Sequence, residues 1–162
     1  MSAPAFDELL RRLVAANAEF VLIGGLALNA WGVVRGTKDV DIVVDKDGDN
    51  LARIAEVAFA LGGQVQTREA FVSSKLSIAA LLADGQRVLI ETDLGPLDVV
   101  QGLPGVPEYP ALRSRAREVE IAGTTILVCS LDDLRDMKRA AGRTRDLADL
   151  EDLETAHGPG TD

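Results

Sequence analysis

FVLIGGLALNAWGVVRGTKDVDIVVD, residues 20–45, contains two apolar runs separated by glycines and small residues. The first run, Phe20–Ile23, stops at the glycine pair 24–25, and a segment rich in helix formers, Leu26–Trp31, follows. The second run is Val40–Val44. Short apolar runs bounded by glycine are typical of buried strands, and paired glycines are typical of turns. The stretch therefore predicts a strand, a tight turn, a short helix and a second strand.

Two aspartates mark the start of the second strand. Because side chains alternate between the faces of a strand, Asp39 and Asp41 are expected on one face, with Val40 and Ile42 on the other. Two carboxylates side by side on an otherwise apolar strand are costly unless a cation joins them. No Cys or His lies nearby, so the oxygen ligands indicate Mg²⁺ or Mn²⁺ rather than zinc.

The glycine pair predicts an anion site next to these acids. Gly24 and Gly25 would let the backbone approach a ligand closely, and the helix that starts there would direct its N–H groups at an anion. Arg35 and Lys38 add positive charge between the glycines and the aspartates. We therefore expect phosphate and divalent metal to share one cleft.

A third carboxylate is expected from a later strand, Leu97–Val100. Asp98 is flanked there by apolar residues, and an acid on a central strand is most simply explained as a metal ligand. Glu91 and Asp93 are the alternatives, although Asp93 more simply caps a turn.

The acidic segment Asp45–Asn50, followed by Glu56, partly imitates a calcium-binding loop. A strand rather than a helix precedes it, and its glycine is displaced to position 48. A polar turn in which Asp47 or Asp49 caps the next helix is the preferred interpretation.

Helical or strand periodicity recurs along the rest of the chain. We expect helices over 6–14, 51–61, 131–141 and up to Leu153, strands over 87–92 and 97–100, and a hairpin of 119–121 with 125–128. Segment 64–82 is the least readable, and the Gly- and Pro-rich segment 102–110 is the natural boundary between two parts.

Composition restricts the chemistry. The chain has 162 residues, 47% of them hydrophobic, which suits one compact domain with a small helical extension. The single Cys129 excludes an internal disulfide, and one His, His157, leaves histidine metal sites and triad hydrolysis without their residues. Carboxylates remain as the chemical groups.

Charge and hydropathy restrict location and partners. No apolar stretch is long enough to span a bilayer and the first residues do not resemble a signal peptide, so a soluble cytoplasmic protein is expected. The net charge of −9 does not favour a large nucleic-acid footprint. Basic residues crowd the last third, where they form either a local basic patch or an ion-paired face.

The motifs together resemble a known family. The pattern resembles the minimal nucleotidyltransferases of the DNA polymerase beta-like superfamily, and within it the AbiEii-like toxin-type branch. The matching positions are Gly24, Gly25, Ala27, Gly32, Arg35, Thr37, Asp39, Asp41, Leu97-Asp98-Val99, Ser130–Leu134, Lys138, Arg143–Asp146 and Asp149. They span roughly residues 20–153, nearly the whole chain.

The resemblance implies an α/β (α+β) fold, a small mixed sheet flanked by helices with a C-terminal helical hairpin. It implies that Asp39, Asp41 and Asp98 bind two Mg²⁺ or Mn²⁺ ions and are catalytic. It implies that Gly24 and Gly25 present backbone to the phosphates of an NTP. Further substrate-binding residues that it implies are Arg35, Thr37 and Lys38, with Lys138 or Arg143 touching the triphosphate and Asp146 orienting one of them.

Two departures distinguish this chain from the commonest version. The superfamily commonly has Ser after the first glycine, where this chain has Gly25, and the gap from the glycines to Asp39 is longer. The expected domains are a nucleotidyltransferase core (1–103), a β-hairpin and helical pair packed on it (104–157), and a disordered tail (158–162).

The expected activity is transfer of an NMP from an NTP to an RNA such as tRNA, to a partner protein or to a small hydroxylated molecule. Membership of a toxin–antitoxin pair, with a cognate antitoxin or toxin, would follow from the resemblance. The alternative is a catalytically silent nucleotide-binding or antitoxin-type module.

Overall fold

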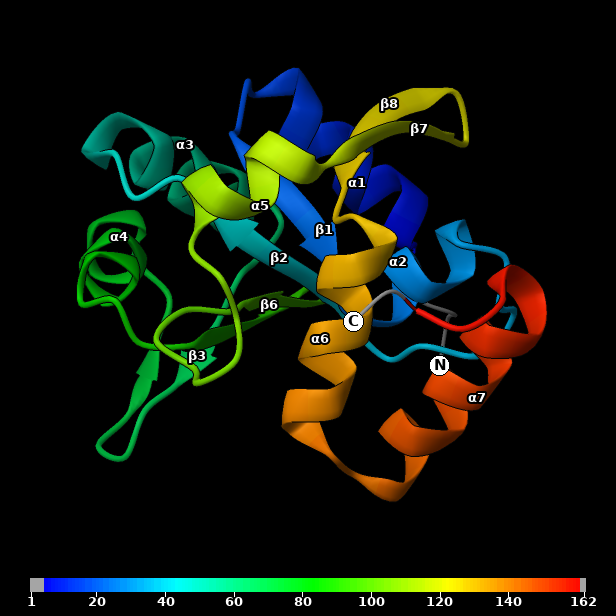
Figure 1. Cartoon of the computed structure of the whole chain (residues 1–162). Coiled ribbons are helices and arrows are strands. Elements are labelled where there is room, and N and C mark those ends of the chain that lie inside the picture. The colour runs from blue at the N-terminus through cyan, green and yellow to red at the C-terminus, as the bar shows by residue number, and fades with distance from the viewer. Residues whose placement is uncertain (1–4, 161–162) are drawn as a thin grey trace.

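Six strands form one mixed sheet at the centre of the protein, in the order β5-β6-β2-β1-β8-β7 (Figure 1). The computed structural model describes residues 5–160. In the middle, β1 (Phe20–Ile23) runs antiparallel to β2 (Val40–Val44). All four side chains of β1 are buried, because this strand has a neighbour on each side and helices pack against it. The strands predicted at 20–23 and 40–44 are confirmed.

The outer strands make the sheet mixed. β6 (Gly95–Val99) pairs in parallel with β2, and β8 (Thr124–Val128) pairs in parallel with β1. The edge strands β5 (Val88–Thr92) and β7 (Arg117–Ile121) each pair antiparallel with the neighbouring strand. The late hairpin β7–β8 is therefore part of the central sheet, and the predicted fold class is confirmed.

Helices flank this sheet. They are α1 (Phe6–Ala15), α2 (Gly24–Ala30), α3 (Gly48–Ala60), α4 (Lys75–Ala83), α5 (Tyr109–Arg115), α6 (Leu131–Ala141) and α7 (Thr144–His157). In Figure 1, α6 and α7 form an antiparallel pair beside the sheet, and α3 and α4 lie together on the opposite side. No helix in residues 5–160 has the length and apolar character needed to cross a bilayer.

Several local expectations need correction. The turn predicted at the glycine pair is shorter than expected, because Gly24, with a φ of +70°, takes the chain from β1 directly into α2, of which it is the first residue. Helix α3 begins at Gly48, and its N-cap residue Asp47 makes no side-chain capping bond. The Asp47 amide instead donates to Asp45 Oδ1 at 3.0 Å. Because α3 begins at Gly48, the acidic segment is the start of a helix rather than an open ion-binding loop.

Two segments contain structure that the sequence did not predict clearly. The poorly readable segment forms a two-stranded hairpin, β3 (Val65–Gln66) and β4 (Phe71–Val72), followed by α4. The boundary loop ends earlier than expected, because α5 starts at Tyr109. Of the expected tail, residues 161–162 lie outside the described part, and the carbonyl of Gly158 accepts a hydrogen bond from Arg135.

Candidate active site

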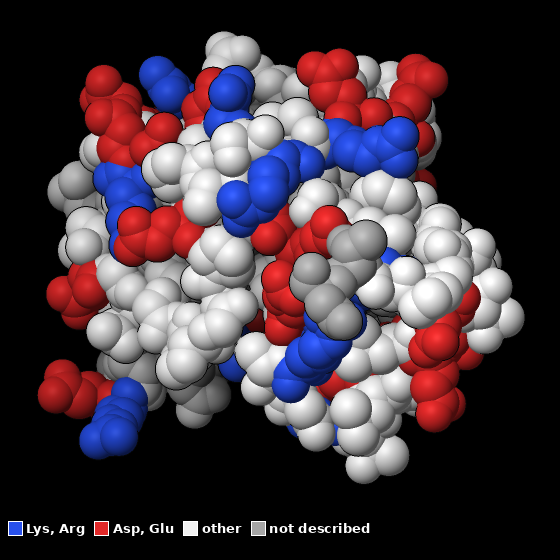
Figure 2. Space-filling view, in the orientation of Figure 1, with Lys and Arg blue, Asp and Glu red and all other residues white. Residues whose placement is uncertain are grey.

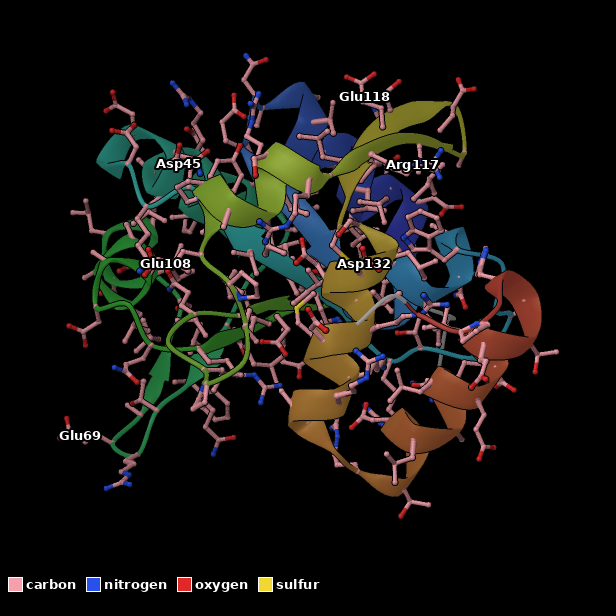
Figure 3. The ribbon with its side chains drawn as sticks, in the orientation of Figure 1. Asp45, Glu69, Glu108, Arg117, Glu118 and Asp132 are labelled. Atoms are coloured by element: carbon pink, nitrogen blue, oxygen red, sulfur yellow. The ribbon has the colours of Figure 1, made fainter. Side chains whose placement is uncertain are left out.

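The expected carboxylates lie together at one end of the central strands. Asp41 on β2 is the direct register partner of Asp98 on β6, because these two strands are parallel neighbours. Asp39 directly precedes β2. Each of the three residues offers a carboxylate oxygen, and these oxygens all lie within 4.8 Å of one another. Other acids differ: Glu69 and Glu118 project outward from the β3–β4 hairpin and from β7 (Figure 3).

The electrostatics of this cluster suit a bound cation. Burial, together with the neighbouring charges of Asp98 and Asp39, raises the pKa of Asp41 to about 7. Carboxylates crowded in this way repel one another unless protons or cations neutralise them. A set of carboxylate oxygens is the donor type that Mg²⁺ and Mn²⁺ prefer. The three aspartates therefore fit the divalent metal that the sequence predicts.

Position 24 must be glycine because its backbone lies against the Asp41 side chain. Its φ of +70° lies in the left-handed region, and a Cβ at this position would lie 2.1 Å from Asp41 Oδ2. Any side chain there would displace the Asp41 carboxylate. Gly24 therefore lets the start of α2 lie directly against the Asp41 carboxylate.

Gly25 makes room for a neighbouring side chain. A Cβ here would lie 2.5 Å from Thr37 Oγ1, so the glycine makes room for the threonine side chain. The Thr37 hydroxyl in turn donates to the Asp39 carbonyl at 3.2 Å. The Gly25–Thr37 contact thus supports the backbone at Asp39, and the Cβ of the more usual Ser would collide with Thr37.

A cleft of about 280 Å³ opens in front of the aspartates. Its polar lining comes from the sheet on one side and from the helical pair on the other. The lining residues are Ile23, Gly24, Asp39, Asp41, Arg87, Asp98, Val100, Leu103, Val106, Leu134, Met137, Lys138, Ala141, Arg143, Arg145 and Asp146. The cleft therefore has an acidic floor, cationic walls and an apolar portion.

The helical pair places a buried cation at this cleft. The Lys138 ammonium lies 3.3 Å from Asp146 Oδ1 and 2.8 Å from Asp149 Oδ2, and all three residues are buried. Arg143 Nε donates to Asp146 Oδ2 at 2.7 Å, and the Arg143 amide donates to the same oxygen. A lysine held by two acids has a fixed position, which suits recognition of an anion.

Arg35 lies behind this cluster. Its Nε is 3.0 Å from Asp149 Oδ1, whereas Lys138 contacts Oδ2 of the same carboxylate. Arg35 is therefore linked to Lys138 through Asp149 and is not among the residues that line the cleft. Gly25, Thr37 and Lys38 are also absent from the lining, whereas the other predicted substrate-binding residues, Gly24, Lys138, Arg143 and Asp146, belong to it.

Arg87 and Arg145 line the cleft but were not predicted as site residues. Arg87 Nε lies 3.0 Å from both carboxylate oxygens of Asp98. The strand pairing would have indicated this contact, because Leu89 is the partner of Asp98 and Arg87 lies two residues further on the same face. Glu91, an alternative third ligand, is exposed on β5.

Part of the basic last third of the chain is ion-paired in the described structure. Arg115 pairs with Asp133, Arg139 with Asp136 and Arg143 with Asp146. Figure 2 shows basic and acidic side chains intermingled on the visible face.

Comparison with known proteins agrees with this geometry. A family model described as the nucleotidyl transferase AbiEii toxin of a type IV toxin–antitoxin system matches residues 8–162. A structure from Thermotoga maritima, described as that of a nucleotidyltransferase, is 18% identical with a TM-score of 0.56, covering 93% of this chain and 90% of the other. No curated protein matches the chain.

Two structures of the antibiotic-resistance factor ANT(2'')-Ia are also similar. The solution structure is 18% identical with a TM-score of 0.58, and covers 93% of this chain and 83% of the other. The crystal structure of the same factor with adenylyl-2''-tobramycin is 15% identical with a TM-score of 0.50, covering 93% and 95%. At these identities the likeness shows a shared fold.

Proposed function

The chain belongs to the AbiEii nucleotidyltransferase toxin family, and from this premise we propose that it is a metal-dependent enzyme that transfers an NMP from an NTP to an acceptor, with release of pyrophosphate. The observation that carries the proposal is the convergence of Asp39, Asp41 and Asp98, whose oxygens lie within 4.8 Å of one another on the floor of a cleft with cationic walls. Such a site is suited to a polyphosphate with its metal.

The three aspartates would hold the metal. Asp39 and Asp41 would bind both ions, and Asp98 would complete the site on the acceptor side and assist deprotonation of the attacking hydroxyl. A divalent ion bound there supplies activation of that hydroxyl and neutralisation of charge on the phosphates.

The walls of the cleft would hold the nucleotide. Lys138, fixed by Asp146 and Asp149, presents a positive charge to the triphosphate, and Arg143 and Arg145 add charge nearby. Gly24 lines the cleft, so a phosphate could approach the backbone at the start of α2. The apolar side chains of Leu103, Val106, Met137 and Ala141 form a surface suited to the base or sugar.

The acceptor classes are an RNA such as tRNA, a partner protein and a small hydroxylated molecule. The family description places its members in toxin–antitoxin systems, which favours a macromolecular acceptor and a cognate antitoxin. The chain is also similar to ANT(2'')-Ia, which has been crystallised with an adenylylated tobramycin. Small-molecule acceptors are therefore included in the labelling experiment.

The test is incubation of the protein with each labelled NTP, Mg²⁺ or Mn²⁺ and cell extract, followed by separation of RNA, protein and small molecules. We expect label on one fraction with the wild-type protein and none with Asp41→Asn. Asp47→Asn removes an exposed carboxylate outside the cleft and should retain transfer. NTP binding without transfer under every condition would contradict the proposal and favour the silent nucleotide-binding module.

A further inference from the structure

Arg87 neutralises one of the three acids in the cleft. Its Nε lies 3.0 Å from both oxygens of Asp98, and its terminal nitrogen also donates to Oδ2. The Asp98 side chain is 3% exposed, whereas that of Arg87 is 51% exposed. The aspartate is thus fixed in the sheet, and its partner is a long side chain at the solvent boundary that is free to take another direction.

A metal ion and Arg87 require the same carboxylate. The guanidinium lies against both oxygens of Asp98, so a cation that takes an oxygen of Asp98 competes with it for negative charge. A positive guanidinium held at that position also repels a divalent ion in the same cluster. Metal binding to these three acids is therefore opposed by Arg87 for as long as Arg87 remains on Asp98.

The cleft provides Arg87 with a second partner once a nucleotide is present. Arg87 lines the same cleft as Lys138, Arg143 and Arg145. The pKa of Arg143 is raised chiefly by its hydrogen bond to Asp146, while the charge of Arg87 opposes this increase and that of Asp41 adds to it. The charges of Arg87 and Arg143 therefore act on one space, and an anion placed there is attracted by both.

We propose that Arg87 exchanges partners, holding Asp98 when the cleft has no metal and binding the triphosphate when metal takes Asp98. The proposal rests on the nucleotidyltransferase function argued above and adds a positioning role for a residue outside its motifs. Metal and nucleotide therefore bind cooperatively. Metal on Asp98 releases Arg87 to bind the nucleotide, and nucleotide on Arg87 leaves Asp98 available to the metal. Metal without nucleotide binds weakly, which keeps the site idle until both arrive.

The test compares Mn²⁺ affinity, measured by electron paramagnetic resonance without nucleotide, in wild type and Arg87→Gln. We expect the variant to bind Mn²⁺ about fivefold more tightly, the size expected for loss of one partly exposed competing ion pair. Affinity for a non-hydrolysable NTP with Mg²⁺ should fall about tenfold in the same variant, because one charge-assisted phosphate contact is lost. Arg53→Gln, which removes an exposed arginine on α3, should leave both affinities unchanged.

Opposite changes in the affinities for Mn²⁺ and for the NTP distinguish partner exchange by Arg87 from a purely structural role. If Arg87 only held Asp98 in place, Arg87→Gln would weaken Mn²⁺ binding, and that result would overturn the proposal. Unchanged Mn²⁺ affinity would overturn it as well. If Mn²⁺ binds neither the wild type nor Arg87→Gln, with or without nucleotide, or binds equally well after Asp41→Asn, then the metal site of the proposed function fails instead.

Discussion

At the scale of single residues, the site depends on how closely Gly24 and Asp41 lie. A Cβ on Gly24 would lie 2.1 Å from Asp41 Oδ2, and the φ of +70° adds backbone strain for any other residue. We expect Gly24→Ala to lower the free energy of unfolding by about 1–2 kcal/mol through the left-handed backbone alone. Displacement of the carboxylate should weaken Mn²⁺ binding by about tenfold or more.

Urea unfolding and Mn²⁺ titration measure these two effects. Gly36→Ala is the matched control, because no atom lies within 4 Å of the Cβ it would add and its φ is not positive. Equal behaviour of the two variants would show that the contact between Gly24 and Asp41 is not required.

A second prediction concerns the pH dependence of stability without metal. The folded pKa of Asp41, about 7, lies above its ordinary value of 3.8, so the folded protein holds this proton more tightly than the unfolded chain. The contribution of Asp41 is therefore fully present below pH 3.8 and is lost as the pH rises through about 7. In chelator, the free energy of unfolding should decline over this range in wild type and decline less in Asp41→Asn.

Metal should reverse this effect. Above pH 7, adding Mg²⁺ neutralises the ionised carboxylates and should raise the wild-type unfolding free energy, with little effect on Asp41→Asn. An identical pH slope in both proteins, measured by denaturant unfolding, would contradict the assignment of the raised pKa to Asp41.

At the scale of elements, prediction from the sequence succeeded where the pattern was local. Phe20–Ile23 and Val40–Val44 are uninterrupted apolar runs, and both are strands. Helix α6 occupies the expected residues 131–141, and its N-cap Ser130 accepts a hydrogen bond from the Asp133 amide at 3.0 Å. α4 was missed because its apolar residues follow no single face, so its two buried residues, Ile78 and Leu82, could not be identified by periodicity.

The site was predictable for similar reasons, and only in part. Asp39, Asp41 and Asp98 stand out because acids are rare within apolar strands. The partners of these acids depend on strand pairing and helix packing, which one sequence does not display. The contacts between Arg87 and Asp98 and between Arg35 and Asp149 arise in this way.

The helical pair supports a third prediction. Asp149 on α7 contacts the buried Lys138 on α6 at 2.8 Å and Arg35 at 3.0 Å. Asp149→Ala removes the carboxylate that Lys138 and Arg35 share. Removal of one member of a buried ion pair costs about 3 kcal/mol of stability. Asp152→Ala on the same helix removes an exposed acid and should change the unfolding free energy by less than about 0.5 kcal/mol. Denaturant midpoints that agree for both variants would refute a structural role for this ion cluster.

At the scale of the whole molecule, the late part of the chain completes the sheet that the early part begins. β8 pairs with β1, and the Cys129 amide donates to the Leu22 carbonyl at 3.0 Å. The cleft is divided in the same way, because Asp39, Asp41 and Asp98 come from the predicted core while Lys138 and Arg143 come from the predicted C-terminal part. Nucleotide binding should therefore require both parts of the chain.

The last prediction follows from this division. A fragment of residues 1–103 loses β8 and leaves β1, whose four side chains are buried in the whole protein, as an uncovered edge. An exposed apolar edge strand favours aggregation. We therefore expect the fragment to lack a cooperative thermal transition by circular dichroism. Adding residues 104–162 as a second chain should restore the transition if the missing sheet partner is the cause. A cooperative transition of the fragment alone would show instead that the core folds independently and that the C-terminal part only contributes its cationic wall.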